Sequence, residues 1–400
     1  MKKIITITLV LIIILGNLNI GFCDDIDLKE NLTALMIAEY DTGEILYEYN
    51  INKKIEIASI TKLMTYLVAM DVISSTDISM DDIVNIGINP TKVGGATFRL
   101  YKGEKVKLET LLDAIIIVSG NDACVAIAEY ITGSEEEFVK MMNEKAKTLG
   151  IKSAVYYNSS GMPIVTKEGK KIQNMMNVND IFKLSRHIIS KYPQILEMTD
   201  RTEIDIIERQ YYRENKNPLL KEIPLVDGLK TGYTDKAGYC LVSTLRIPKN
   251  DENDQSFRII SIAMGAKSEL ESKEINKKII NYVMDNYKKE HILSKNVSLS
   301  ELEIVDAVNP NLKVFPKDDI FKIKKLGDTF NIKLELNEKI IPPISKGEKV
   351  GKVLINHNDK IQEVDVIVKR DVKKADFFTR LFRVLQNFVL KINIGNLFGR

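Results

Sequence analysis

The sequence predicts a mixed α/β (α+β) sandwich, followed by a small all-β domain and a C-terminal amphipathic helix. Three patterns support this prediction. Strand-like apolar runs stand near both ends of residues 24–290, helical periodicity fills the stretch between them, and short β-rich runs follow His291. A sheet and helices that each bury one apolar face pack into layers. At 400 residues and 44% apolar content, the chain is long enough for more than one domain.

Residues 1–23 are typical of an export signal. Two lysines at positions 2 and 3 precede an apolar run over residues 4–15, which is too short to span a bilayer comfortably. Cleavage is expected after Cys23. A buried N-terminal helix is one alternative, and lipid attachment at Cys23 is another, which the bulky Phe22 disfavours.

Five helices and three strand regions are expected in the first domain. The helices are predicted over 59–72, 108–130, 135–149, 178–191 and 273–287. The strand regions are 35–49, with a turn at Asp41-Thr42-Gly43, then 228–246 and 258–265. The long helical run over 108–130 is interrupted at Ser119-Gly120-Asn121.

The periodicity changes near His291. Short β-rich runs occur at 321–325, 330–336, 350–356 and 362–368, and the last thirty residues return to a helical period. We therefore expect four segments. These are a signal over 1–23, a first domain over 24–290, an all-β domain over 291–370, and an amphipathic helix over 371–400.

Composition excludes several classes of function. The net charge is only +2 and both signs are spread along the chain, so no nucleic-acid partner is expected. Three scattered histidines and three cysteines make a metal site improbable, and no cofactor is expected. The sequence does not decide whether Cys124 and Cys240 pair or stay free.

Three short motifs carry the chemistry, and they occur in the order Ser59-Ile60-Thr61-Lys62, Ser119-Gly120-Asn121 and Lys230-Thr231-Gly232. Residues i and i+3 share one face of a helix, so Lys62 can reach the Ser59 hydroxyl. A serine needs an adjacent base to become a nucleophile, and lysine can serve if burial and a second cation lower its pKa. Lys230 is the candidate second cation. A helix N-cap serine beside an exposed lysine is the structural alternative.

The chain resembles the low-molecular-mass penicillin-binding proteins of the D-alanyl-D-alanine carboxypeptidase type. The stretches that carry the resemblance are 58–64, 118–123, 226–235 and 237–242. It implies a serine β-lactamase/transpeptidase-like sandwich for the catalytic domain and a stalk for the β-rich domain. It also implies that Ser59 is the acylated nucleophile, Lys62 its base, and Ser119 and Asn121 a proton relay and a holder of the substrate amide.

The third motif is expected to bind the substrate. By the resemblance, Lys230 and Thr231 bind its terminal carboxylate, and the backbone N–H groups of Ser59 and Tyr233 form the oxyanion hole. Gly232 is expected because a side chain there would obstruct substrate lying along the strand edge.

The resemblance implies hydrolysis of the terminal D-Ala-D-Ala bond of peptidoglycan stem pentapeptides through an acyl-serine intermediate. It also implies acylation by penicillin and other β-lactam antibiotics. Three alternatives remain: an endopeptidase, a weak β-lactamase, or a poorly catalytic wall-binding protein. The β-lactamase pattern Glu-x-x-Leu-Asn is absent between the second and third motifs.

Two positions depart from the family pattern. Ser272 stands where an arginine often helps to hold the substrate carboxylate, and the neighbouring Lys273 is a candidate replacement. The stretch 158–162 also lacks a histidine that is frequent in the family.

The C-terminal segment is expected to bind a membrane surface. Its apolar face is formed by Phe377, Phe378, Leu381, Phe382, Leu385, Phe388, Val389 and Ile392. Basic residues lie mainly on the other face, as in interfacial helices, although a helix docked on its own domain is the alternative. The expected location is the extracytoplasmic face of the bacterial cell membrane.

Overall fold

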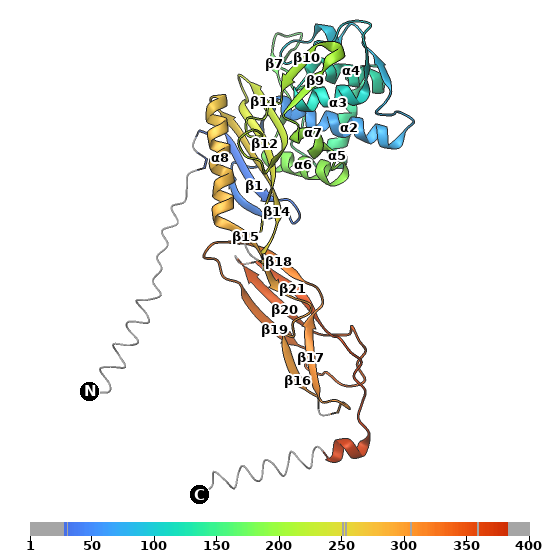
Figure 1. Cartoon of the computed structure of the whole chain (residues 1–400), viewed down its shortest axis with the longest axis vertical. Helices are drawn as coiled ribbons and strands as arrows, with labels where there is room; N and C mark the ends of the chain where they lie inside the picture. Colours follow the sequence, from blue (N-terminus) through green and yellow to red (C-terminus); the bar gives the residue numbers. More distant parts are fainter. Residues whose placement is uncertain are drawn as a thin grey trace, which may run out of the picture.

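The computed structural model describes residues 28–29, 31–249, 252, 254–304, 306–357 and 360–382. The expected export signal and most of the C-terminal helix lie outside these residues. The molecule is elongated, with a mixed helix and sheet body at one end and a β-rich body at the other (Figure 1). The predicted fold class is confirmed for these two parts.

A five-stranded antiparallel sheet forms the centre of the first body, in the order β11-β12-β14-β1-β2. Its strands are β1 (Ala34–Glu39), β2 (Ile45–Tyr49), β11 (Val226–Thr234), β12 (Gly238–Ile247) and β14 (Phe257–Ala266). Strand β1 pairs with β14, so the two ends of the predicted domain meet in one sheet. All six residues of β1 are buried, because both faces of the sheet are covered.

Two cores lie on opposite faces of this sheet. Met36 packs into a large core with the central helices, whereas Leu35 and Ile37 pack with helix α8 (Glu269–Asn286) on the other face. This alternation is the period of two that a strand imposes on its side chains. In Figure 1, α8 lies along one side of the sheet and the remaining helices lie on the other.

The central helical layer follows the prediction with two differences. Its helices are α2 (Lys62–Ser75), α3 (Leu108–Ile117), α4 (Asn121–Thr132), α5 (Glu135–Thr148), α6 (Val178–Lys191) and α7 (Ile195–Asp200). The run 108–130 is two helices that break at the second motif, and α7 was not predicted. Among the described residues, no helix has the length and apolar character needed to cross a membrane.

Helix α8 begins at Glu269, four residues before its predicted start. Ser268 caps it, because the Ser268 hydroxyl accepts a hydrogen bond of 3.1 Å from the backbone N–H of Glu271. This earlier start places Glu269 and Ser272 in the first turn of the helix, and both matter below.

Several short elements were not predicted, because two to four residues carry too little periodicity. They are β3 (Ile55–Glu56), η1 (Ala58–Thr61), β4 (Ile83–Asn85), η2 (Pro90–Lys92), β5 (Lys105–Lys107), β6 (Ile164–Val165), β7 (Lys171–Ile172), β8 (Met175–Met176), β9 (Glu203–Ile206), η3 (Ile207–Arg209), β10 (Tyr211–Glu214) and β13 (Asp254–Gln255). Tertiary contacts stabilise them. Arg209, for example, packs over the ring of Phe98 and forms an ion pair of 2.6 Å with Glu104.

The second body is all β, as predicted. A five-stranded sheet has the order β16-β17-β21-β20-β19, and β15 and β18 form a smaller sheet with β13. The strands are β15 (Tyr287–Leu293), β16 (Ser300–Glu303), β17 (Asn311–Pro316), β18 (Ile320–Lys325), β19 (Asn331–Leu336), β20 (Lys349–His357) and β21 (Lys360–Val368). Valines and isoleucines from these strands form a third, separate core.

A buried ion pair joins the two bodies. Glu39 on β1 is fully buried, and Lys289 on β15 reaches it with its Nζ 3.2 Å from a carboxylate oxygen. The other carboxylate oxygen of Glu39 accepts hydrogen bonds of 2.6 Å from the N–H and the hydroxyl of Thr42. Strand β15 follows α8 without a loop, so this pair fixes the direction in which the β-rich body leaves the sheet.

Replacing Lys289 with methionine should lower the free energy of unfolding by about 3 kcal/mol, because Glu39 would keep a buried charge without its cation. Urea denaturation followed by circular dichroism measures this change. Lys295→Met is the matched control, since the pair between Lys295 and Asp319 is exposed and should contribute at most about 1 kcal/mol. Equal losses in the two variants would contradict the role given to the buried pair.

Candidate active site

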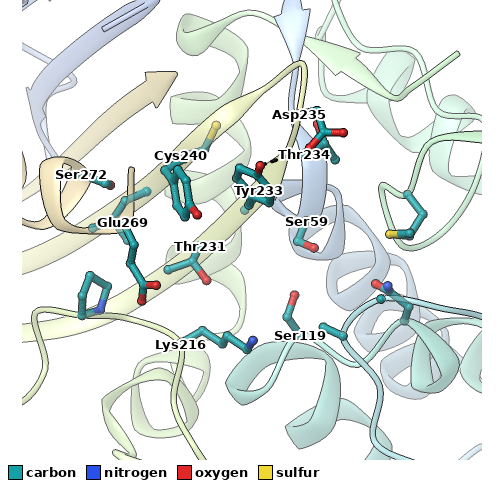
Figure 2. Close-up of a pocket in the computed structure, with 18 of the residues that line it drawn as sticks. Ser59, Ser119, Lys216, Thr231, Tyr233, Thr234, Asp235, Cys240, Glu269 and Ser272 are labelled. Atoms are coloured by element: carbon teal, nitrogen blue, oxygen red, sulfur yellow. Dashed lines mark hydrogen bonds between the residues drawn. The ribbon is translucent and has the colours of Figure 1, made fainter. Parts of the chain in front are cut away.

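The three motifs meet in one cleft of about 510 Å³ between the sheet and the helical layer. Six of the eight predicted site residues line it: Ser59, Ser119, Asn121, Thr231, Gly232 and Tyr233. The other two, Lys62 and Lys230, are buried. Figure 2 shows the hydroxyls of Ser59 and Ser119 pointing toward each other, with Thr231 farther along the cleft.

Ser59 lies in a tight 3₁₀ turn, Ala58–Thr61, that leads directly into α2. Ala58 has a φ of +45°, which a non-glycine residue adopts at an energetic cost. Two glycines make room for this turn. A Cβ on Gly161 would overlap the carbonyl of Ala58, and a Cβ on Gly232 would lie 3.1 Å from the backbone nitrogen of Ser59.

The structure gives a further reason for glycine at position 232, beside the expected one that a side chain would obstruct the substrate. A side chain there would press on the backbone of the Ser59 turn. The close approach brings strand β11 against the nucleophile, and Tyr233 is the next residue on that strand. The two backbone segments that carry the expected oxyanion hole are thus in contact.

The Lys62 amine sits among three oxygen atoms. Its Nζ lies 2.9 Å from Ser59 Oγ, 2.7 Å from Asn121 Oδ1 and 2.7 Å from the carbonyl oxygen of Ser160. A neutral amine has two N–H donors and one lone pair. The amide and carbonyl oxygens can only accept, so they take the two N–H groups and leave the lone pair facing the Ser59 hydroxyl.

Burial lowers the pKa of Lys62, although the charge of nearby Asp122 acts in the opposite direction. Burial also lowers the pKa of Lys230 well below its usual value, and repulsion from Lys62 adds to this effect. Within the described part of the chain, neither lysine forms an ion pair with a carboxylate. The site therefore favours uncharged amines, which is the state a base requires.

Asn121 is held by a loop that the sequence did not identify. Its Nδ2 donates to the carbonyl of Gly94 at 2.8 Å, which turns Oδ1 toward Lys62. The buried carboxylate of Asp122 holds the same loop, because it accepts hydrogen bonds from the N–H groups of Phe98 at 2.7 Å and Leu100 at 3.0 Å. The orientation of the Asn121 amide thus depends on Asp122, the residue that follows the motif.

Ser119 has a φ of +61°, an unusual conformation for a residue with a side chain. Its backbone bridges the end of α3 and the start of α4. Strained backbone that is held by its surroundings is common where a side chain must point into a site. The positive φ of Ser119 explains why the long predicted helix breaks at the motif.

The stretch 158–162 also contributes to the site. Ser160 provides the carbonyl that accepts from Lys62, and the adjacent Ser159 carbonyl accepts from Thr65 on α2 at 2.6 Å. The amide of Asn174 donates to the carbonyl of Asn158 at 2.9 Å. The sequence indicated nothing about this stretch except a missing histidine. Every residue type has a backbone carbonyl, so the residue types do not show which carbonyl accepts a hydrogen bond.

Lys273 was a candidate replacement for the missing arginine, and the structure places it outside the cleft. Lys273 does not line the cleft, because its Nζ is bound to Glu222 at 2.6 Å. Lys273 and Lys277 together lower the pKa of Glu222 to about 2. The cleft is lined instead by Ser272 and by Lys216, a residue that the sequence did not suggest. Figure 2 shows the Lys216 amine close to Ser119.

The two cysteines are free and buried. The question that the sequence left open is therefore answered for these residues. Cys240 lies on β12 opposite Gly232 of β11 in the register of the sheet.

Comparisons with known proteins agree with this geometry. A family model described as D-alanyl-D-alanine carboxypeptidase matches residues 28–268, and a model of the C-terminal domain of penicillin-binding protein 5 matches residues 287–374. The chain is 32% identical over 366 residues to the D-alanyl-D-alanine carboxypeptidase DacF of Bacillus subtilis (strain 168), covering 90% of each protein.

Further relatives show the same relationship. The D-alanyl-D-alanine carboxypeptidase DacD of Escherichia coli (strain K12) is 29% identical over 357 residues, covering 86% of this chain and 88% of that protein. The crystal structure of the D-alanyl-D-alanine carboxypeptidase DacD from Francisella tularensis superposes with a TM-score of 0.66 at 26% identity. That match covers 86% of this chain and 94% of the other.

The lowered pKa of Lys62 has a measurable consequence. If its neutral amine is the base, acylation of Ser59 should accelerate as pH rises through that pKa, and the rise should finish below the value of about 10.4 for a solvated lysine. The measurement is the rate constant for acylation by penicillin between about pH 5 and pH 10.

Lys62→Arg is the decisive variant, because a guanidinium keeps its proton at every accessible pH. It should slow acylation by about 10²- to 10⁴-fold and abolish the pH dependence. An acylation rate within about tenfold of the wild type would contradict the assignment of Lys62 as the base.

Proposed function

Because this chain belongs to the D-alanyl-D-alanine carboxypeptidase family, we propose that Ser59 is its acylated nucleophile and that Lys62 is the base which activates it. The chain is a serine-type D-Ala-D-Ala carboxypeptidase. It hydrolyses the terminal D-Ala-D-Ala bond of peptidoglycan stem pentapeptides through an acyl-serine intermediate, and penicillin acylates it. The roles of individual residues are proposed from their geometry.

In the acylation step, Ser59 Oγ attacks the carbonyl of the penultimate D-alanine while its proton moves to Lys62 Nζ, 2.9 Å away. The N–H groups of Ser59 and Tyr233 stabilise the oxyanion. The Ser119 hydroxyl, which points toward Ser59, relays a proton to the leaving amine (Figure 2). The C–N bond breaks, D-alanine leaves, and an ester at Ser59 remains.

In the second step, water attacks the ester and Lys62 again takes a proton. Asn121 binds the amide of the substrate through the second N–H of Nδ2 or the second lone pair of Oδ1. Lys62 and the Gly94 carbonyl use the other N–H and lone pair. Penicillin leaves a bulkier acyl group on Ser59. Its amine does not depart, because the nitrogen of the opened ring stays attached to the acyl group. The absence of the β-lactamase pattern supports slow release of that adduct.

The terminal carboxylate of the substrate is bound at the end of the cleft beyond Ser59. Thr231 offers a hydroxyl there, Lys216 an exposed ammonium, and Lys230 a buried amine next to the Thr231 backbone. Lysine lacks the planar fork of arginine, so recognition of the carboxylate should be less strict than with a guanidinium.

One observation carries the proposal. The Lys62 amine is buried, has no carboxylate partner within the described residues, and has two acceptors that orient its lone pair toward Ser59. A wall-binding protein without catalysis would not need a desolvated amine there, because such burial costs stability. This argument favours the carboxypeptidase over the poorly catalytic alternative.

The proposal extends to the position of the enzyme. We assign the first body, expected over 24–290, to the catalytic domain and the β-rich body, expected over 291–370, to a stalk. In the structure the β-rich body begins with β15 at Tyr287 and includes Val372, which pairs with Ile344. We assign the segment after Ala375 to the surface of the membrane on its extracytoplasmic face. In the described part of that segment, residues 377–382 are helical. Phe377, Phe378 and Phe382 are at least 62% exposed, which supports an interfacial rather than a docked helix.

Ser59→Ala should abolish covalent labelling by a fluorescent penicillin and reduce D-alanine release from a pentapeptide by several orders of magnitude. Ser74→Ala is the control, because Ser74 is an exposed serine on the same helix as Lys62. Labelling that persists in Ser59→Ala would place the nucleophile elsewhere. Labelling without any D-alanine release by the wild type would contradict the carboxypeptidase.

Removing the chain after Ala375 should release the enzyme from anionic vesicles and leave D-alanine release unchanged. The cut is placed there because Val372 belongs to the core of the β-rich body and pairs with Ile344, and Ala375 is buried as well. Flotation with vesicles measures binding. If the mature full-length protein does not float, or if the shortened chain floats equally well, residues after Ala375 are not the membrane-binding segment.

A further inference from the structure

The cleft carries two opposite charges that lack partners within the described residues, one on each side of Thr231 (Figure 2). Lys216 and Glu269 both line it and both are exposed. Among the described residues, neither side chain forms an ion pair or a side-chain hydrogen bond with any other. In Figure 2 the Glu269 carboxylate points into the cleft on the side of Thr231 away from Ser59.

This end of the cleft is also open. Ser272, one turn after Glu269 on α8, presents only a hydroxymethyl group to the cleft. A second hollow of about 520 Å³ adjoins the cleft at Lys216, Pro218 and Glu269, which line both. A side chain that extends past the terminal carboxylate of a substrate therefore has space to occupy.

The charges decide which side chain fits. The terminal carboxylate of a stem peptide has Lys216 and Thr231 available, whereas Glu269 would only repel it. Glu269 is complementary to a cation, and the second hollow begins at this residue. A terminal residue with a long aliphatic side chain ending in an ammonium would satisfy both charged groups of the cleft at once.

We propose that Glu269 is a specificity-determining residue which adapts the leaving-group site to stem peptides ending in a D-amino acid with a cationic side chain, such as D-lysine. This inference rests on the carboxypeptidase function proposed above. The reaction is unchanged: Ser59 Oγ forms the ester, the C–N bond to the terminal residue breaks, and the departing nitrogen takes a proton. Water then cleaves the ester.

The test uses the mature full-length protein and three peptides that differ only in the terminal residue: D-alanine, D-lysine and D-norleucine. D-Norleucine keeps a four-carbon chain and lacks the charge, so it separates charge from size. The quantity measured is kcat/KM for release of the terminal residue. The wild type should prefer D-lysine to D-norleucine by about threefold to fivefold, the range of an exposed ion pair.

Glu269→Gln should remove this preference, so that kcat/KM for D-lysine falls to about that for D-norleucine. Glu274→Gln removes a charge from the exposed side of the same helix and should leave all three rates unchanged. Raising the salt concentration should reduce the preference of the wild type, because exposed charges are screened.

Three results would overturn the inference. They are equal rates for D-lysine and D-norleucine in the wild type, a preference that survives in Glu269→Gln, and an equal gain for all three peptides in that variant. The last result would mean that Glu269 only repels the carboxylate. If the wild type released no D-alanine, the result would instead contradict the proposed carboxypeptidase function.

Discussion

The burial of two lysine amines without a carboxylate partner in the described structure is the constraint on which the site depends. Lys62 is completely buried and Lys230 is 2% exposed. An ammonium in such surroundings loses its hydration without gaining an opposite charge, so burial lowers the pKa of both groups. Fixed acceptors for the two N–H groups of Lys62 then leave its lone pair for the serine. A carboxylate beside Lys62 would raise its pKa and favour the charged ammonium, which cannot act as the base.

This constraint explains the packing around the nucleophile. Water must be kept from Lys62, so the Ser59 turn is enclosed by backbone from two sides, at Gly161 and at Gly232. The two glycines lie on separate elements, one in the loop 158–162 and one on β11. The central sheet provides the rigidity for this arrangement, since β11 is anchored to β12 along eight residue pairs. The strain at Ala58 and Ser119 is retained because tertiary contacts fix both segments.

Much of this could be predicted from the sequence, for a physical reason that also sets the limit. The pair of Ser59 and Lys62 is local, since a helical turn alone brings them together, and the strand periodicity predicted the sheet. The carbonyls of Ser160 and Gly94 hold the catalytic side chains through backbone atoms, which any residue type provides. The role of Lys216 depends on the path of the loop between β10 and β11, which the sequence does not predict. Lys273 was a reasonable candidate by proximity in sequence, and its bond to Glu222 directs it elsewhere.

The two ends of the cleft differ in how freely they can change. Near Ser59 the buried polar side chains depend on one another, since Lys62 is bonded to Asn121 and Asp122 holds the loop to which Asn121 donates. A substitution there disturbs several contacts at once, because buried networks are coupled. At the leaving-group end, Lys216 and Glu269 are exposed and hold nothing else in place within the described structure. Substitutions at these positions cost little stability. Selection for a different terminal residue can therefore act on that end while the acylation machinery stays intact.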